Sequence, residues 1–208
     1  MAKNIALLGS TGSIGRQTLD VVRNLGIRVS GMAVNSNIDI LEEQCREFKP
    51  SIASISTKEL AAELEYRLKG LDIEVVYGVD GMKKVASTEE ADTVLSAIVG
   101  IAGLLPTIEA VRAGKNIALA NKETLVTAGK LFIDEAKKHK INIYPVDSEH
   151  AAVFQCLAGN RHEDIARLIL TASGGPFRGK SQQELKNVTV AEALRHPNWK
   201  MGKKITID

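Results

Sequence analysis

The chain has 208 residues, of which 44% are hydrophobic and 25% charged, enough for one large domain or two modest ones around a sizeable core. A net charge of +2 and 4% aromatic residues argue against a nucleic-acid-binding protein, which needs a basic surface and rings on which bases stack. The early apolar run, residues 5–8, is too short for a signal peptide or a membrane span. We therefore expect a cytoplasmic protein with neither nucleic acid nor membrane as a partner.

Strands and helices alternate along most of the chain. The first unit is a strand at 4–8, a glycine turn at 9–15, a helix at 13–25 and a strand at 28–34. Apolar runs predict further strands at 52–55, 73–76, 93–98, 116–120, 141–146 and 168–172, and three- and four-residue spacing predicts helices at 38–48, 57–69, 105–113, 122–138 and 150–157. This alternation predicts an α/β fold with a doubly wound, mostly parallel, Rossmann-like sheet.

The texture changes after residue 171. Turn-rich stretches at 173–179 and 196–202 flank a short helix expected at about 190–195, and residues 203–208 look like part of a strand. We expect a first domain over 1–150 and a second region over 151–208. Cys45 and Cys156 are isolated in helix-like segments, which predicts reduced structural thiols.

Three glycines follow the first strand at G-x-x-G-x-x-G spacing: Gly9, Gly12 and Gly15. This spacing lets backbone amides approach a pyrophosphate at the positive end of the next helix, where Thr11 and Ser13 add hydroxyls. The alternative is a tight turn with glycine for close packing. Residues 34–38 contain no acid for a ribose diol, which permits NADP, but also no Arg or Lys for a 2′-phosphate.

Two carboxylates, Asp147 and Glu149, follow the apolar run 141–144 at the carboxyl end of an expected strand. With period-two alternation they share a face, and their hard oxygens suit Mg²⁺ or Mn²⁺. The alternative is a helix start in which Asp147 is the cap and Glu149 complements the helix dipole. The residues alone leave both interpretations open.

Other polar residues follow strands as well. Asn121, Lys122 and Glu123 begin a helix at the expected ligand-bearing edge, although Asn121 also suits an N-cap and Glu123 a first turn. Ser173 precedes two glycines that offer backbone donors for a phosphate, and His196 and Trp199 lie in a loop that can close over it. Taken singly, His196 fits a surface position and Trp199 ordinary packing.

Six ordered motifs, GSTGSIG, AIVGIAGLLPT, ALANKETLV, PVDSEH, SGGPF and RHPNWKMG, resemble those of the 1-deoxy-D-xylulose 5-phosphate reductoisomerase family over essentially the whole chain. The resemblance implies an enzyme that rearranges this ketose phosphate and reduces the product with NADPH to 2-C-methyl-D-erythritol 4-phosphate, in the methylerythritol phosphate route to isoprenoids, assisted by Mn²⁺ or Mg²⁺. It also implies that residues 1–150 bind NADPH, that residues 151–208 begin a catalytic α+β region with an active-site loop, and that the full-length protein is a homodimer.

The resemblance also assigns residues. It places Gly9, Thr11, Gly12, Ser13, Ile14, Asn37, Asn121, Lys122, Glu123 and Gly202 at the cofactor, and Asp147 and Glu149 at the metal. It places Ser148, Glu149, Ser173, His196 and Trp199 at the substrate, with Trp199 as a covering aromatic, and it implies catalytic roles for Glu149, Lys122 and His196.

The sequence departs from the family pattern in two respects. Asn35 and Ser36 stand where the family commonly has a glycine and a basic residue, which weakens the expectation of NADPH over NADH. The family continues past a segment like KITID to an Asn-Lys-x-x-Glu stretch that carries phosphate contacts and a third metal carboxylate. We therefore expect weak metal binding and little or no turnover by this chain alone. The competing hypotheses are a non-catalytic nucleotide-binding module and a generic NAD(P) dehydrogenase.

Overall fold

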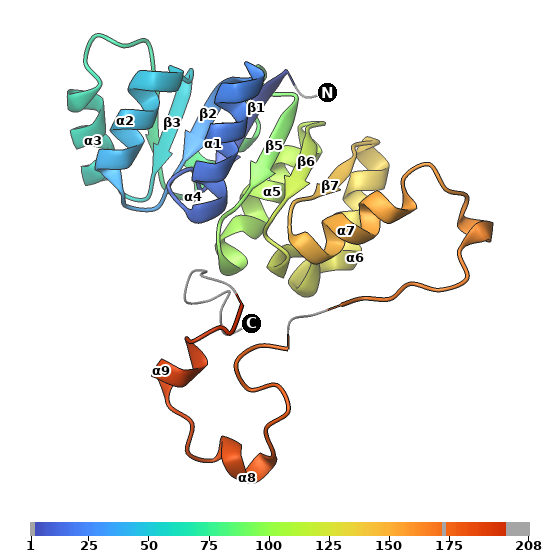
Figure 1. The fold of residues 1–208 in the computed structure, drawn as a ribbon. Helices are drawn as coiled ribbons and strands as arrows, with labels where there is room; N and C mark the ends of the chain where they lie inside the picture. Colours follow the sequence, from blue (N-terminus) through green and yellow to red (C-terminus); the bar gives the residue numbers. More distant parts are fainter. Residues whose placement is uncertain (1–2, 172–173, 199–208) are drawn as a thin grey trace. The chain divides into compact units, whose positions relative to one another are not determined.

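A seven-stranded, wholly parallel sheet organises the chain (Figure 1). The computed structural model describes residues 3–171 and 174–198. The strands are β1 Asn4–Leu8, β2 Arg28–Ala33, β3 Ile52–Ile55, β4 Glu74–Tyr77, β5 Thr93–Ser96, β6 Asn116–Leu119 and β7 Ile143–Pro145. The α-helices are α1 Ser13–Leu25, α2 Ile38–Phe48, α3 Lys58–Arg67, α4 Gly78–Ala86, α5 Leu104–Arg112, α6 Glu123–His139, α7 Ser148–Leu157, α8 Gln182–Leu185 and α9 Val190–Ala193, with 3₁₀ turns η1 Gly100–Gly103 and η2 His162–Asp164. The predicted doubly wound α/β fold is confirmed.

The strand order is β4-β3-β2-β1-β5-β6-β7. From β1 the chain builds outward to β4, then returns to pair β5 with the other side of β1 and builds outward again. The β1–β5 junction is thus the topological switch point, and ligands of doubly wound sheets bind outside the carboxyl ends of the strands at such a point. At that edge, the Ala97 amide donates to the Leu8 carbonyl at 2.9 Å, which extends the pairing one residue beyond β5.

Hydrophobic clusters cover both faces of the sheet. Successive residues of β1 point to opposite faces, so Leu7 packs into one cluster and Leu8 into the other. The first cluster contains the buried sides of α1, α2 and α3, and Figure 1 shows α1 and α2 in front of the sheet. The second contains residues of α4, α5 and α6, with Phe132 fully buried. Because both faces of the sheet are packed, the strand ends that carry the candidate site have fixed positions.

The elements differ from expectation in two places. Residues 168–172 were expected to form a strand, but 168–171 have no regular secondary structure and residue 172 lies outside the described part. Leu168, Ile169 and Leu170 are 61–71% exposed, so this apolar run has neither a pairing strand nor a covering layer in the described residues. Helix α4 was not expected, because two glycines, Gly78 and Gly81, interrupt its helical pattern. The remaining core elements match their expected positions within about two residues at most ends.

Contacts divide the chain into two compact units, Met1–Ala151 and Ala152–Asp208. The first contains the sheet and its helices. The described part of the second contains most of α7 and three short helical segments, two of which begin with a capping box, at Ser181 with Glu184 and at Thr189 with Glu192. Within the residues that the structure describes, no helix is both long and apolar enough to cross a membrane. The NADPH-binding and catalytic roles expected of the two regions stay predictions.

Candidate functional site: the carboxyl edge of the sheet

The glycine turn after β1 is packed tightly enough to exclude side chains. Gly9 has φ +95°, and a Cβ there would lie 2.8 Å from the Ala97 carbonyl oxygen. A Cβ on Gly15, in the first turn of α1, would lie 2.2 Å from the Gly9 carbonyl oxygen. Close packing of strand and helix therefore requires glycine at both positions. Gly12 and Ser13 of the same turn are exposed, so the close packing is compatible with the nucleotide-binding interpretation.

The start of α1 offers a favourable setting for an anion. Its N-cap is Gly12, which has no side chain with which to cap, and the first turn contains no acidic residue. The first amides of a helix have no intrahelical partner and lie at the positive end of the helix dipole. Gly12 and Ser13 are exposed, and Thr11 and Ile14 are half-buried. The loop thus fits a pyrophosphate by donor type and access.

A buried polar pair holds this loop from behind. The Ser10 hydroxyl donates to Gln44 Oε1 at 2.6 Å, and Gln44 Nε2 donates to the Ser10 carbonyl oxygen at 3.1 Å. Gln44 comes from α2, on the inward side that also carries Leu41 and Cys45. Gln44 was not among the residues predicted for the site. A polar residue among the inward-facing apolar positions of α2 was the signal that could have found it.

The turn after β2 is exposed at residues 35–37. Asn37 caps α2 by accepting the Ile40 amide at 3.2 Å, and the Ser56 amide donates to the Asn35 carbonyl oxygen at 2.9 Å. The contact of Asn37 with the cofactor stays a prediction. If it forms, the Asn37 side chain both caps α2 and contacts the cofactor.

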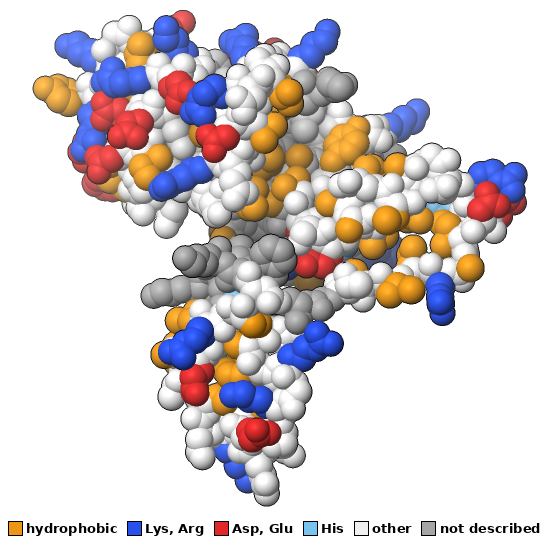
Figure 2. Space-filling view, viewed as in Figure 1, with side chains coloured by type: hydrophobic (Ala, Val, Ile, Leu, Met, Phe, Trp, Pro, Cys, Tyr) orange, Lys and Arg blue, Asp and Glu red, His pale blue; other side chains and the backbone are white. Residues whose placement is uncertain are grey.

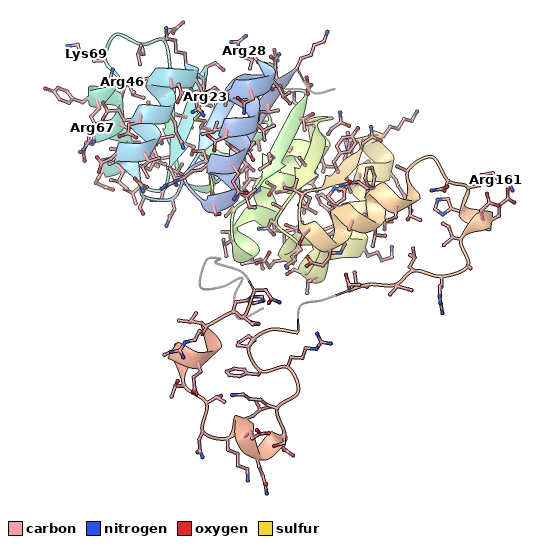
Figure 3. All side chains as sticks on the ribbon, viewed as in Figure 1. Arg23, Arg28, Arg46, Arg67, Lys69 and Arg161 are labelled. Atoms are coloured by element: carbon pink, nitrogen blue, oxygen red, sulfur yellow. The ribbon has the colours of Figure 1, made fainter. Side chains whose placement is uncertain are left out.

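Two arginines of α2 and α3 are already paired with acids. Arg67 bonds to Asp39, Glu42 and Glu63, while Arg46 bonds to Glu42. Figure 3 shows Arg46 and Arg67 together on the α2 and α3 side of the sheet, and Figure 2 shows basic and acidic side chains interspersed there. These ion pairs connect the two helices. They do not form a separate basic patch for a phosphate.

The β5 and β6 turns are fastened to each other through Asn121, which is 2% exposed. Its Nδ2 donates to the carbonyl oxygens of Ile98 and, at 2.8 Å, of Gly100, and its Oδ1 accepts from the Thr124 amide and hydroxyl, both at 3.0 Å. The bond from the Thr124 amide has the form of a capping bond, although α6 begins at Glu123 and its N-cap is Lys122, which makes no side-chain capping bond. With its amide group fully engaged, Asn121 orders the turn between β5 and α5.

Lys122 and Glu123, which follow Asn121, lie at the same edge of the sheet. Glu123 Oε1 accepts the Gly100 amide at 3.3 Å, and Lys122 is exposed. Because β1, β5 and β6 are adjacent parallel strands, their carboxyl ends place residues 9–14, 97–103 and 121–123 along one edge. The cofactor and catalytic roles of these residues stay predictions.

The carboxylates after β7 begin a helix. Asp147 Oδ2 accepts the His150 amide at 3.4 Å and lies 2.6 Å from His150 Nδ1, so Asp147 caps α7 as the alternative interpretation predicted. Glu149 is exposed in the first turn and accepts the Ser148 hydroxyl at 3.0 Å. A hollow of about 60 Å³ at this edge is lined by Leu119, Lys122, Leu125, Ile143, Pro145, Asp147 and His150.

The donor set fits a hard cation in part. Asp147 and Glu149 supply carboxylate oxygens of the kind that Mg²⁺ and Mn²⁺ prefer. Over residues 3–171 and 174–198, no group of three or more His, Cys, Asp or Glu side chains is arranged to hold a metal. The weak metal binding expected of a site with two protein carboxylates stays a prediction.

The remaining predicted residues belong to the second unit. His196 Nδ1 accepts the Asn198 amide at 3.2 Å. Ser173, Trp199 and Gly202, predicted at the substrate and the cofactor, lie outside the described residues.

A larger hollow, of about 430 Å³, lies at the opposite edge of the sheet, where β3 and β4 begin. Its lining is polar and of mixed charge: Ser51, Ile52, Glu74, Lys84, Ser87, Thr88, Glu89 and Glu90. Lys84 and Glu74 form an ion pair there. It contains none of the predicted site residues and lies at the edge away from the switch point, so its size does not make it the candidate site.

The family model described as 1-deoxy-D-xylulose 5-phosphate reductoisomerase matches residues 5–129, and the model of that enzyme's C-terminal domain matches residues 143–208. The chain belongs to the 1-deoxy-D-xylulose 5-phosphate reductoisomerase family. It is 61% identical to the reductoisomerases of Ruminiclostridium cellulolyticum and Acetivibrio thermocellus, over 100% of this chain and 55% of each relative. The chain thus spans about half the length of the curated reductoisomerases it matches.

Solved reductoisomerase structures agree in fold. A crystal structure described as a DOX-P reductoisomerase in complex with NADPH, fosmidomycin and magnesium matches with a TM-score of 0.90 and 44% identity, over 99% of this chain and 54% of that one. The reductoisomerase of Zymomonas mobilis in complex with NADPH matches with a TM-score of 0.86 and 40% identity, over 95% of this chain and 52% of that one. The fold and family expected from the six motifs are confirmed.

Proposed function

We propose that this chain contains the NADPH-binding part, and some of the metal and substrate ligands, of an enzyme that converts 1-deoxy-D-xylulose 5-phosphate to 2-C-methyl-D-erythritol 4-phosphate. The observation that carries the proposal is the glycine turn with its uncapped helix start at the switch point of a reductoisomerase-family sheet. Relatives described with NADPH and magnesium support the choice of ligands.

In this proposal the cofactor pyrophosphate binds the amides of residues 11–14 at the start of α1, with Gly9 allowing the close approach. The other cofactor contacts are made by Asn37, Lys122, Glu123 and Gly202, while Asn121, buried with its side-chain amide fully engaged, supports the site through the turn that it orders. Residues 1–150 form the cofactor domain, and residues 151–208 contribute an active-site loop. Asn121 and Glu123 order the turn at residues 98–100, beside the proposed cofactor site.

The substrate end of the site is proposed around the start of α7. Asp147 and Glu149 would hold Mn²⁺ or Mg²⁺, and the bond between His150 and Asp147 would orient that carboxylate. When bound, such a cation supplies charge stabilisation for substrate oxygens as the carbon skeleton rearranges. Ser148, Ser173 and His196 would hold the substrate, and Trp199 would cover it and exclude water. Glu149, Lys122 and His196 are the residues proposed to act in the chemistry.

The proposal extends to the setting of the enzyme. A small sugar phosphate is the expected substrate, the cytoplasm the expected location, and a homodimer the expected state of the full-length protein. None of these features requires nucleic acid or a membrane as a partner.

Calorimetry and a turnover assay test this proposal together. NADPH added to the folded chain should give a saturable binding heat, and NADPH oxidation with 1-deoxy-D-xylulose 5-phosphate and Mn²⁺ should be slow or absent. Any turnover that does occur should be lost in Glu149→Gln and kept in Glu163→Gln, which neutralises an exposed acid elsewhere. A well-folded chain that gives no binding heat with NADPH would refute the proposed cofactor role.

A second candidate is a nucleotide-binding module without catalysis. It is favoured by the capping bond of Asp147, which gives this carboxylate a structural role that needs no metal. This candidate predicts that Asp147→Asn and Glu149→Gln leave Mn²⁺ affinity and every activity unchanged. The proposed reductoisomerase predicts that either change weakens Mn²⁺ binding.

A further inference from the structure

Gln44 joins α2 to the glycine turn by two hydrogen bonds in a buried place. Ser10 is 0% exposed and Gln44 is 7% exposed. The two residues are 34 positions apart, and each uses both a donor and an acceptor: hydroxyl to Oε1 at 2.6 Å, and Nε2 to carbonyl at 3.1 Å. Burying an amide side chain is unfavourable unless its polar atoms are paired. The two bonds give both polar atoms of the buried Gln44 side chain a partner, and that partner is Ser10.

Further hydrogen bonds fix the backbone of the glycine turn on either side of Ser10. The amides of Gly9 and Ser10 both donate to the Ala33 carbonyl oxygen, at 2.7 and 3.3 Å, and the Gly12 amide donates to the Gly9 carbonyl oxygen at 3.2 Å. Gln44 also binds the hydroxyl and the carbonyl oxygen of Ser10, so the polar groups of residues 9–10 make hydrogen bonds within the protein. The next residues, 11–14, are the ones with exposed or half-buried positions at the start of α1.

We propose that Gln44 is a positioning residue for the cofactor: through Ser10 it holds the glycine turn in the conformation that receives the pyrophosphate. The inference rests on the proposed NADPH binding at this turn. Gln44 does not touch the cofactor in this account. Its effect is to raise the fraction of molecules whose turn is already arranged, and apparent affinity falls in proportion when that fraction falls.

The test compares three variants of this chain. Gln44→Met keeps a side chain of similar length but cannot form either bond, and Ser10→Ala removes only the hydroxyl. Cys45→Ala is the control, because it removes buried volume from the adjacent position of α2 without touching Ser10. Calorimetry gives NADPH affinity, and hydrogen exchange monitors the amides of Gly9, Ser10 and Gly12.

Gln44→Met should raise the NADPH Kd about tenfold and speed exchange at these three amides. Ser10→Ala should raise the Kd less, and Gln44→Met should cost less affinity in the Ser10→Ala background, because the two residues are coupled. Cys45→Ala should lower the melting temperature and leave the Kd unchanged.

Two outcomes would overturn the inference. One is an unchanged Kd and unchanged exchange in Gln44→Met, and the other is a Kd that rises as much in Cys45→Ala as in Gln44→Met. If the unaltered chain bound no NADPH, the proposed function would fail, and the exchange arm would still decide whether Gln44 positions the turn. Ser10→Ala provides this decision even if Gln44→Met fails to fold.

Discussion

The carboxylate of Asp92 accepts the backbone amide of Lys3 at 2.8 Å, across 89 positions of sequence, and so ties the beginning of β1 to the beginning of β5. The Asn4 amide donates to the same oxygen at 3.1 Å, and the Thr93 hydroxyl to the other oxygen at 2.8 Å. These two strands form the switch point, so the bond fixes the pair of strands on which the candidate site is built.

This bond predicts a pH-dependent stability. Burial opposes ionisation of Asp92, but hydrogen bonds from Lys3, Thr93 and Asn4 outweigh it and hold the pKa of Asp92 below its usual range. A lowered folded-state pKa stabilises the protein above the unfolded-state pKa of about 3.9, and this stabilisation is lost as pH falls through the folded-state value. Asp92→Asn should therefore lower unfolding free energy by roughly 1–2 kcal/mol at pH 7. In urea titrations the difference in unfolding free energy between the variant and the unaltered chain should disappear below about pH 4. A difference that stays constant from pH 7 to pH 2 would contradict the assignment.

Asn121 is expected to be among the least replaceable polar residues of the first unit. Asn121→Ala leaves the carbonyls of Ile98 and Gly100 and the Thr124 donors without these partners, which should cost roughly 2–3 kcal/mol of unfolding free energy. Chemical denaturation measures the loss. Asn24→Ala, at an exposed position on α1, is the control and should change stability by less than about 0.5 kcal/mol. Equal losses in the two variants would show that Asn121 does not order the turns.

Gly15 should not accept even a methyl group. A Cβ there meets the Gly9 carbonyl oxygen at 2.2 Å and the Ser10 backbone at 2.7 Å, so Gly15→Ala must displace the glycine turn. We expect a loss of NADPH affinity of more than about tenfold, because the displaced amides no longer face the pyrophosphate. Gly129→Ala, inside α6, is the matched control, since a Cβ there meets nothing within 4 Å. Calorimetry measures the NADPH affinity of samples that circular dichroism shows to be folded. An unchanged affinity in Gly15→Ala would refute this role of the turn.

Cofactor preference should respond to a basic residue after β2. Ser36 is exposed, and Arg67, which reaches Asp39 in the first turn of α2, is already engaged with acids. Ser36→Arg should therefore increase the preference for NADPH over NADH, by about threefold to tenfold, through pairing with the 2′-phosphate. Glu89→Gln changes net charge by the same amount at the opposite edge of the sheet and should leave the ratio of the two Kd values unchanged. An equal effect of both variants would mean that only overall charge matters.

Much of the fold followed from local sequence patterns. Short apolar runs bounded by turns gave the strands of the first unit, because buried parallel strands read as nearly continuous apolar sequence. Helix α4 was missed for a tertiary reason: a Cβ on Gly81 would lie 2.8 Å from Ser54 Oγ, so contact with β3 requires the glycine that weakens the helical pattern. The run at 168–170 was mistaken for a strand, since local hydrophobicity does not reveal whether a partner strand exists.

The candidate site was predictable only in part. Glycine spacing and the residues after β6 and β7 pointed to the carboxyl ends of parallel strands, and the strand order places these ends along one edge of the sheet. The sequence did not show that Asp147 caps α7, because capping and metal binding use the same residue type at the same place. Nor did it show the bond between Gln44 and Ser10, since a contact across 34 positions depends on how α2 packs against the sheet.

The most direct measurement is backbone amide chemical-shift mapping of this chain during an NADPH titration. If NADPH binds at the glycine turn, the largest changes fall at residues 9–14, 35–37, 98–103 and 121–123, along the carboxyl edge of β1, β2, β5 and β6. Amides around Ser51, Glu74 and Lys84, at the larger hollow of the opposite edge, should stay unchanged. Saturable changes centred on that hollow, or no changes in a folded sample, would contradict the account.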